Sequence, residues 1–176
     1  VPAAERNEKQ QATLSKFIKA VDTELKNLNV ALGADGAPCN NSLNIFNEMR
    51  LAALIHKPSA GPRAMKAQEV LDLATLGGAK ALGWSADIGS IEVGKKADLV
   101  ALDLQTLENR VPEASLLDPE ALAAAIVYSS QPTHVRATFV DGRKLYEAGN
   151  VLTIPRDSLE KAVAQAQSEV LKTLQN

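Results

Sequence analysis

The residues Asn29 to Gly36, NVALGADG, join a short apolar run to a glycine-rich turn. An apolar run of this length that ends at a glycine predicts a buried strand over residues 29–33. The segment that follows, ADGAPCNNS, is dense in turn-forming residues and predicts a loop. Because α/β folds place functional groups at the carboxyl ends of parallel strands, Asp35 is the first candidate for chemistry.

Helices are predicted on both sides of this strand. Upstream, helical spacing over residues 13–28 is set by Leu14, Phe17, Ile18, Val21, Leu25 and Leu28. Downstream, Asn41 or Ser42 can cap a helix over residues 43–56, and the prolines of KPSAGPRA end it. A further helix is predicted over residues 67–82, with the core face Val70, Leu71, Ala74, Gly78 and Leu82. Its small residues Gly77, Gly78 and Ala79 would let another backbone approach closely.

Strands and turns replace the helical periodicity after Gly83, so the main internal boundary is expected at about residue 86. Strands are predicted over residues 98–104, 135–140 and 144–146. Asp141-Gly142 predicts the turn of a hairpin, and a second turn is expected at Gly149-Asn150.

Two more helices are predicted in this half of the chain. Asp118 and Pro119 are an N-cap and first-turn pair for a helix that runs to about Tyr128. Asp157 and Glu160 have capping-box spacing and open a terminal helix. One apolar stripe on that helix predicts packing by one face: Leu159, Val163, Ala166, Val170 and Leu174.

Composition narrows the function classes. The chain has 176 residues, of which 45% are apolar, so it can bury a substantial core. A formal net charge of −2 provides no broad cationic field, which argues against nucleic acid or a membrane surface as partner. A single cysteine excludes an intramolecular disulfide, and the sequence shows neither a long apolar run nor a signal peptide. We therefore expect a cytoplasmic protein.

Asp35 has two interpretations from local sequence. A carboxylate at a strand end can bind a metal or accept a proton, but Asp-Gly is also among the commonest turn dipeptides. Asn40 and Asn41 could orient a polar substrate, whereas helix capping explains Asn41 equally well. Cys39 would act as a nucleophile only with a base beside it, and we expect His56 and His134 to be structural.

Four segments together resemble the amidohydrolase superfamily. They are VALGADGAPCNN (30–41), NEMRLAALIHK (47–57), ATLGGAKALG (74–83) and IGSIEVGKKADLVALD (88–103). The match is to the branch of aminohydrolases and chlorohydrolases that act on triazines, nucleosides and nucleobases. It covers residues 15–151 in order and spacing.

The resemblance implies an α/β fold, the C-terminal portion of a (β/α)8 TIM-like barrel followed by strands of a small flanking β-sandwich and a terminal helix. Residues 13–86 would be the last units of the barrel, residues 87–176 the sandwich strands with packing helices, and residues 1–12 an unmatched polar segment. Asp35 would be the metal ligand and general base. Zn²⁺ or Fe²⁺ is the implied metal of a complete enzyme.

The histidine ligands of that superfamily lie upstream of the matching region, so this chain is expected to be one part of a larger enzyme. A single carboxylate does not hold a catalytic metal alone. The leading hypothesis is a metal-dependent hydrolase of C–N or C–Cl bonds on a small heterocyclic substrate. Its partner would be the missing N-terminal portion of the barrel, or a second copy through self-association. The competing hypothesis is a non-catalytic scaffold or interaction module.

Overall fold

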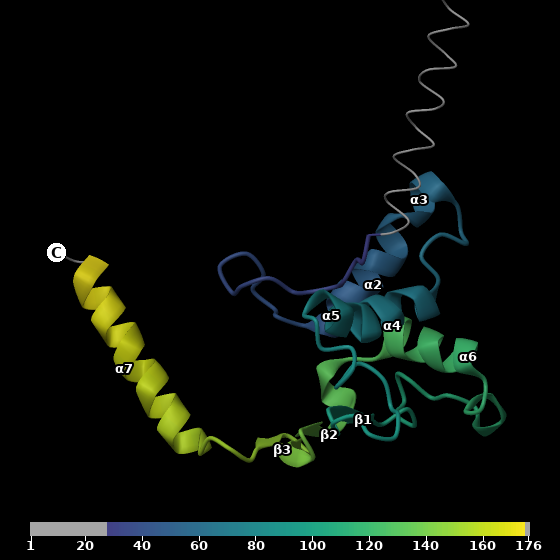
Figure 1. Ribbon diagram of the computed structural model, residues 1–176. Helices are drawn as coiled ribbons and strands as arrows, with labels where there is room; N and C mark the ends of the chain where they lie inside the picture. The colour runs from purple at the N-terminus through teal and green to yellow at the C-terminus, as the bar shows by residue number, and fades with distance from the viewer. Residues whose placement is uncertain (1–27, 175–176) are drawn as a thin grey trace, which may run out of the picture. The chain divides into compact units, whose positions relative to one another are not determined.

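The computed structural model describes residues 28–174, so the helix predicted over 13–28 lies outside the described residues apart from Leu28. The chain divides into two compact units, Val1–Val30 and Ala31–Asn176, and the fold below is that of the second. Helices and strands are mixed (Figure 1). The first half holds the helices α2 (Ile45–Ile55), α3 (Lys57–Ala60), α4 (Ala67–Ala74) and α5 (Leu76–Ala81). The second half holds β1 (Leu99–Leu102), η1 (Glu113–Ser115), α6 (Pro119–Ala124), η2 (Ala125–Ser129), η3 (Pro132–His134), β2 (Val135–Val140), β3 (Arg143–Glu147), β4 (Asn150–Val151) and α7 (Arg156–Leu174).

The apolar core lies where α2, α4 and η2 meet. Its buried members are Phe46, Met49, Ala53, Val70 and Val127. The predicted helix over 43–56 is confirmed as α2, but its N-cap is Asn44, whose Oδ1 accepts from the amide of Phe46 at 3.1 Å. The prediction of Asn41 or Ser42 as the cap was wrong, because the loop continues for two more residues. KPSAGPRA does end α2, although its first four residues form the short helix α3.

The helix predicted over 67–82 is broken into α4 and α5. Thr75 leaves the helical region at φ −121° and ψ −93°, which ends α4 and separates it from α5. Leu82, predicted to be in the core, is 63% exposed because α5 stops before it. The predicted close approach occurs at Ala79, which is buried against the backbone of Gly89.

The strands form one antiparallel sheet in the order β1-β2-β3-β4. The Asp141-Gly142 turn is confirmed, with φ of 49° and 77°, the left-handed geometry that suits the twist of a two-residue hairpin. The next turn is formed by Ala148 and Gly149, so Asn150 lies in β4 and not in the turn as predicted. Within residues 28–174 there is one sheet, so the second layer of the expected sandwich is not present there.

The helix that follows Asp118 is confirmed. Oδ1 of Asp118 accepts from the amide of Glu120 at 3.0 Å, and Pro119 occupies the first turn. After Ala124 the helix widens into the π-helical turn η2. Arg50 of α2 ties itself to the end of this turn, because its Nε donates to the carbonyl of Tyr128 and its Nη2 to the carbonyl of Ser130.

The strand predicted over residues 29–33 is absent from the structure. Residues 29–33 are neither a strand nor buried. The amide of Leu32 donates to the carbonyl of Leu73 at 3.0 Å. A strand requires a neighbouring strand to pair with, and the sheet described within residues 28–174 does not include this segment.

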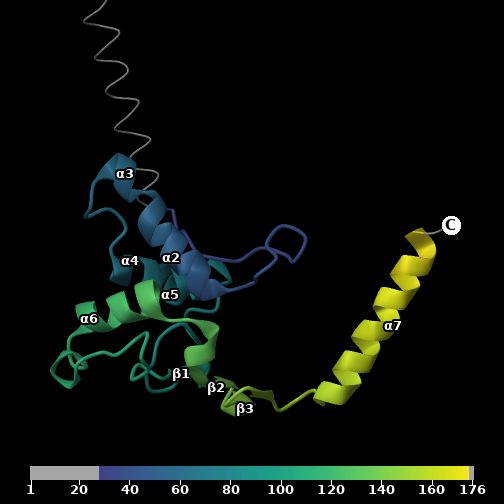
Figure 2. The same cartoon turned by 180° about the vertical axis from the view of Figure 1, so that it is seen from behind.

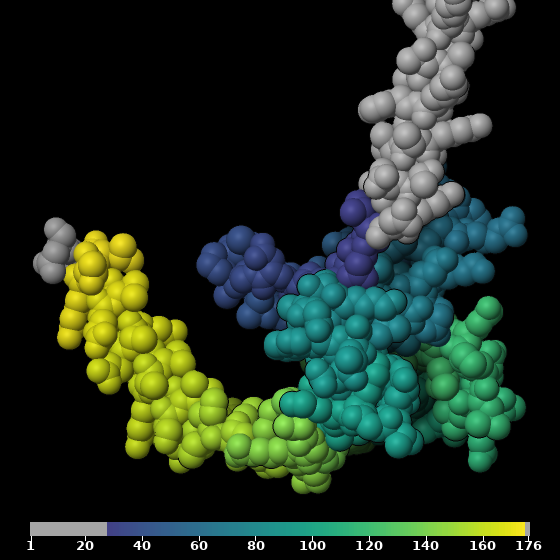
Figure 3. Space-filling model, in the orientation of Figure 1, coloured from purple at the N-terminus to yellow at the C-terminus, as the bar shows by residue number. Residues whose placement is uncertain are grey.

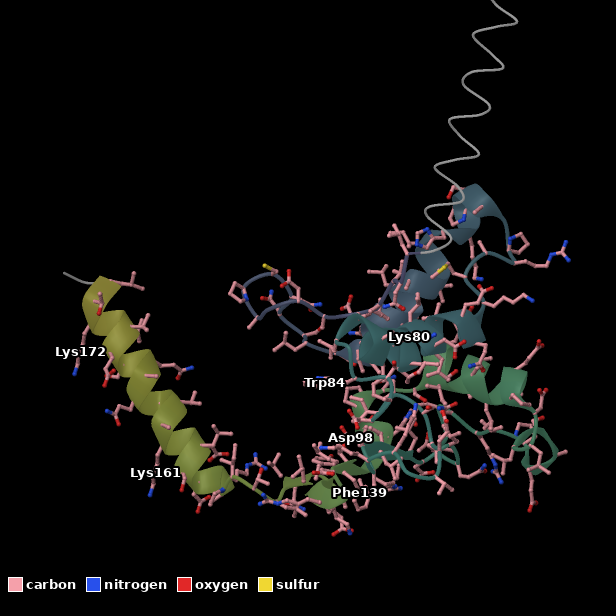
Figure 4. All side chains as sticks on the ribbon, viewed as in Figure 1. Lys80, Trp84, Asp98, Phe139, Lys161 and Lys172 are labelled. Atoms are coloured by element: carbon pink, nitrogen blue, oxygen red, sulfur yellow. The ribbon has the colours of Figure 1, made fainter. Side chains whose placement is uncertain are left out.

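The terminal helix α7 exists, but all of its described side chains are exposed, so it does not pack by one face as predicted. Asp157 lies in its first turn rather than at the cap. Figure 2 shows α7 from behind, and Figure 4 shows Lys161 and Lys172 projecting from the same side of it. No described helix is long and apolar enough to cross a membrane.

Candidate functional site

The Asp35 loop, residues 33–42, is visible as the dark blue loop in Figures 1 and 3. Asp35 is exposed and adopts a left-handed backbone conformation with φ of 58°, which aspartate tolerates better than most residues. Its Oδ1 accepts a hydrogen bond from the amide of Gly36 at 2.7 Å. This bond is also what a turn aspartate makes, so the geometry by itself is compatible with both interpretations of Asp35.

The next residues close the loop. The amides of Cys39 and Asn40 both donate to the carbonyl of Gly36, each at 2.9 Å. Nδ2 of Asn40 donates to Oε1 of Glu48 at 2.7 Å, and Oδ1 of Asn40 accepts from the amide and the hydroxyl of Ser42. Asn40 is thus directed into the protein, whereas Asn41 is exposed.

The remaining candidates are Cys39 and the two histidines. Cys39 is exposed. His56 ends α2, as its place in the sequence predicts. His134 is buried, with Nδ1 accepting from the amide of Gln131 at 3.2 Å and Nε2 at 3.3 Å from Oγ1 of Thr106. A ring engaged on both nitrogens is a structural histidine and is not free to act as a base for Cys39.

The lysine-rich segment 84–96 is a structural turn. Lys95 is largely buried, and its Nζ donates to the carbonyl of Ser85 at 2.7 Å and to Oγ of Ser90 at 2.6 Å. The hydroxyl of Ser90, and next to it Lys95, lower the pKa of the Glu92 carboxyl. The ammonium group of Lys95 is thus occupied within the turn, and Nζ of Lys96 lies 3.6 Å from Oδ2 of Asp141, so both lysines have partners in the protein.

A metal requires more ligands than this loop supplies. A carboxylate such as Asp35 is a suitable oxygen ligand for zinc, but a catalytic zinc takes three protein ligands. Residues 28–174 contain no group of three histidine, cysteine, aspartate or glutamate side chains that could hold an ion. The described residues therefore do not form a zinc site by themselves.

Comparison with known sequences settles the family. The sequence model described as "Amidohydrolase family" matches residues 2–145. This chain belongs to the amidohydrolase family. Members of its sequence neighbourhood include the 5-methylthioadenosine/S-adenosylhomocysteine deaminase of Acetivibrio thermocellus, which is 40% identical over 161 residues, 90% of this chain and 36% of that protein. The 5'-deoxyadenosine deaminase of Methanosarcina acetivorans is 37% identical over 83% of this chain and 32% of its own length.

Solved structures agree with this assignment. An adenosine deaminase from Xanthomonas campestris with bound zinc matches this amidohydrolase chain with a TM-score of 0.74 and 33% identity, over 85% of this chain and 33% of that one. An atrazine chlorohydrolase from Arthrobacter aurescens, complexed with zinc, matches with a TM-score of 0.60 and 27% identity, over 76% of this chain and 28% of that one. The neighbours imply a TIM-barrel type of fold, and the chain spans about a third of the length of these relatives.

Sequence reasoning singled out Asp35 and Asn40 in this amidohydrolase but missed Glu48. The signal was present, because Glu48 lies in the first turn of the helix that directly follows the loop. A carboxylate in that position is readily assigned to the helix N-terminus alone. Its bond to Asn40, eight residues earlier, is visible only once the path of the loop is known.

Proposed function

We propose that this chain is the C-terminal portion of a zinc-dependent amidohydrolase that removes an amino group from an adenosine-type heterocycle. Residues 13–86 contribute the last units of the barrel, and residues 87–176 contribute the small sheet and the terminal helix. The 40% identity to a methylthioadenosine/S-adenosylhomocysteine deaminase over 90% of this chain is the observation that carries the proposal.

Cleavage of a C–Cl bond is the second candidate, favoured by the structural likeness to the atrazine chlorohydrolase. That likeness is weaker in both identity, 27%, and TM-score, 0.60, than the likeness to the zinc-bound adenosine deaminase, 33% and 0.74. Deamination is therefore the preferred reaction. A scaffold without catalysis, the alternative from sequence, receives no support from these relatives.

Within this proposal, Asp35 is the residue of this chain that takes part in chemistry, as a zinc ligand and proton acceptor. Its carboxylate is exposed, and the amide of Gly36 holds Oδ1 at 2.7 Å, which restricts the side chain to a narrow range of orientations. A carboxylate held in this way can accept a proton without first reorganising. Asn41, which is exposed on the same loop, is proposed as a substrate contact.

The test is a chimera with a relative. The 161-residue matching region of the Acetivibrio thermocellus deaminase is replaced by the corresponding residues of this chain, and the product is assayed with 5-methylthioadenosine. We expect zinc binding and release of ammonia. A folded, zinc-loaded chimera that releases no ammonia from this substrate but releases chloride from a chlorotriazine would move the assignment to the second candidate. Inactivity toward both substrates would contradict the proposal.

A further inference from the structure

The loop that carries Asp35 is fastened to α2 by one pair of side chains. Nδ2 of Asn40 donates to Oε1 of Glu48 at 2.7 Å in a partly buried position. At its other end, Oδ1 of Asn40 accepts from the amide of Ser42 at 3.2 Å and from its hydroxyl at 3.0 Å. We infer that Asn40 and Glu48 are positioning residues that set the Asp35 loop on α2. Their part in catalysis rests on the proposed function of Asp35.

A continuous series of hydrogen bonds joins this pair to Asp35. The backbone amide of Asn40 donates to the carbonyl of Gly36 at 2.9 Å, and so does the amide of Cys39. On the other side of the same residue, the amide of Gly36 donates to Oδ1 of Asp35 at 2.7 Å. Gly36 is therefore bonded both to the turn that Asn40 completes and to the carboxylate, so a displacement of Asn40 is passed on to Asp35.

The other end of the series lies on a helix that packs in the core. Glu48 lies one turn after the N-cap of α2, between the buried side chains of Phe46 and Met49 along the sequence. Arg50, the residue after Met49, donates to the carbonyl oxygens of Tyr128 and Ser130, which lie 78 and 80 residues away along the chain. Glu48 thus connects the loop to the packed core rather than to another surface loop.

This arrangement changes the role of Asn40. The sequence predicts a substrate contact, but both the nitrogen and the oxygen of the Asn40 carboxamide make hydrogen bonds to neighbouring residues of the chain. A substrate that donated to this oxygen would have to displace Ser42, which already supplies two hydrogen bonds to it. Hydrogen bonds to a carboxylate are among the stronger ones in proteins, which favours Asn40 as part of the support of the loop.

Amide hydrogen exchange in the 176-residue chain tests this inference without any enzyme assay. In Glu48→Ala the amides of Cys39 and Asn40, which donate to Gly36, should exchange about tenfold faster or more, as the net worth of a hydrogen bond to a charged group implies. Glu48→Gln keeps an oxygen acceptor and should retain most of the protection. Glu120→Ala removes a carboxylate from the first turn of another helix, α6, and should leave these amides unchanged.

A double variant separates the pair from a general loss of stability. If the bond between them is what matters, Asn40→Ala with Glu48→Ala should exchange no faster than Asn40→Ala alone. Unchanged exchange of Cys39 and Asn40 in Glu48→Ala would overturn the inference, as would equal acceleration in Glu120→Ala.

The same substitutions in the chimera report on catalysis. Glu48→Ala should lower kcat roughly 10- to 100-fold, the scale of a small misplacement of a reacting group, with less change in KM and with recovery in Glu48→Gln. Accelerated exchange with unchanged kcat would refute the part in catalysis and leave the support of the loop intact. Failure of the proposed function would instead appear as an inactive parent chimera.

Discussion

Among the glycines whose surroundings the structure describes, Gly89 is the one where an added methyl group should cost the most. Its φ is 93°, and a Cβ at this position would lie 2.6 Å from Cβ of Ala79, 3.1 Å from Cα of Leu76 and 3.4 Å from the carbonyl oxygen of Thr75. Two of these three atoms belong to the backbone of the α4–α5 region and cannot swing away. Ala79 is itself buried, so relief of the clash requires α5 to move.

The magnitude follows from two contributions. A left-handed conformation costs an alanine about 1–2 kcal/mol, and forcing an extra carbon into a packed site adds about 1–3 kcal/mol. Gly94 is the matched control, because its φ is 97° but nothing lies within 4 Å of the place that a methyl group would take there. Gly94→Ala should therefore carry only the conformational part, about 1–2 kcal/mol.

Urea unfolding of both variants at one fixed protein concentration measures the difference. We expect Gly89→Ala to lower the free energy of unfolding by roughly 2–5 kcal/mol, clearly more than Gly94→Ala. Fixed concentration is needed because association would otherwise contribute to the apparent stability. Equal losses in the two variants would show that the approach of Gly89 to α5 is not tight, and the packing argument would fail.

Three further predictions concern the second half of the chain. Asp98 accepts from the amide of Asp141 at 2.6 Å, so Asp98→Ala should lower the free energy of unfolding by about 1 kcal/mol while Asp87→Ala changes it little. Hydrogen bonds from Arg136, and next from the amide of Gln105, lower the pKa of the Asp103 carboxyl. The ionised Asp103 carboxylate stabilises the fold above the ordinary aspartate pKa of about 3.9. This stabilisation is lost as the pH falls toward the lower pKa that the group has in the folded protein. Wild type should thus lose more stability than Asp103→Asn on acidification below about pH 4, and equal losses would refute this. Sedimentation should show self-association, because Ile91, Val93 and Leu107 are at least 89% exposed, and a compact monomer would contradict it.

Local chemistry explains what could be predicted from sequence. The Asp141-Gly142 turn and the Asp118 cap depend on a few adjacent residues, and both are confirmed. The break at Thr75 was missed because apolar residues keep their helical spacing across it, and the break reflects packing of α5 against the Gly89 turn. The prediction of a strand over residues 29–33 was wrong because a strand forms only where a neighbouring strand supplies the hydrogen-bond partners.

In the candidate site, too, local features could be predicted from the sequence and tertiary contacts could not. Asp35 and its turn follow from the dipeptide Asp-Gly and the family motif, and the comparisons confirm the family. The bond from Asn40 to Glu48 and the anchoring of α2 through Arg50 to Tyr128 join residues that local sequence does not associate. Interactions of this kind depend on the tertiary path of the chain, so periodicity and propensity do not reveal them.

Asp35→Asn in the chimera asks whether this carboxylate takes part in chemistry or only shapes its turn. Asparagine keeps the shape of the side chain and one acceptor oxygen, so the bond from the amide of Gly36 can persist while the negative charge and the basic oxygen are lost. We predict that ammonia release falls roughly 100-fold or more, the scale for removal of a general base, while the free energy of unfolding changes by less than about 1 kcal/mol, as expected for an exposed residue. Asp87→Asn, an exposed aspartate in the segment after α5, is the matched control and should retain full turnover. Near-normal turnover of Asp35→Asn together with a much lower Tm would contradict the catalytic role and leave Asp35 as a turn aspartate.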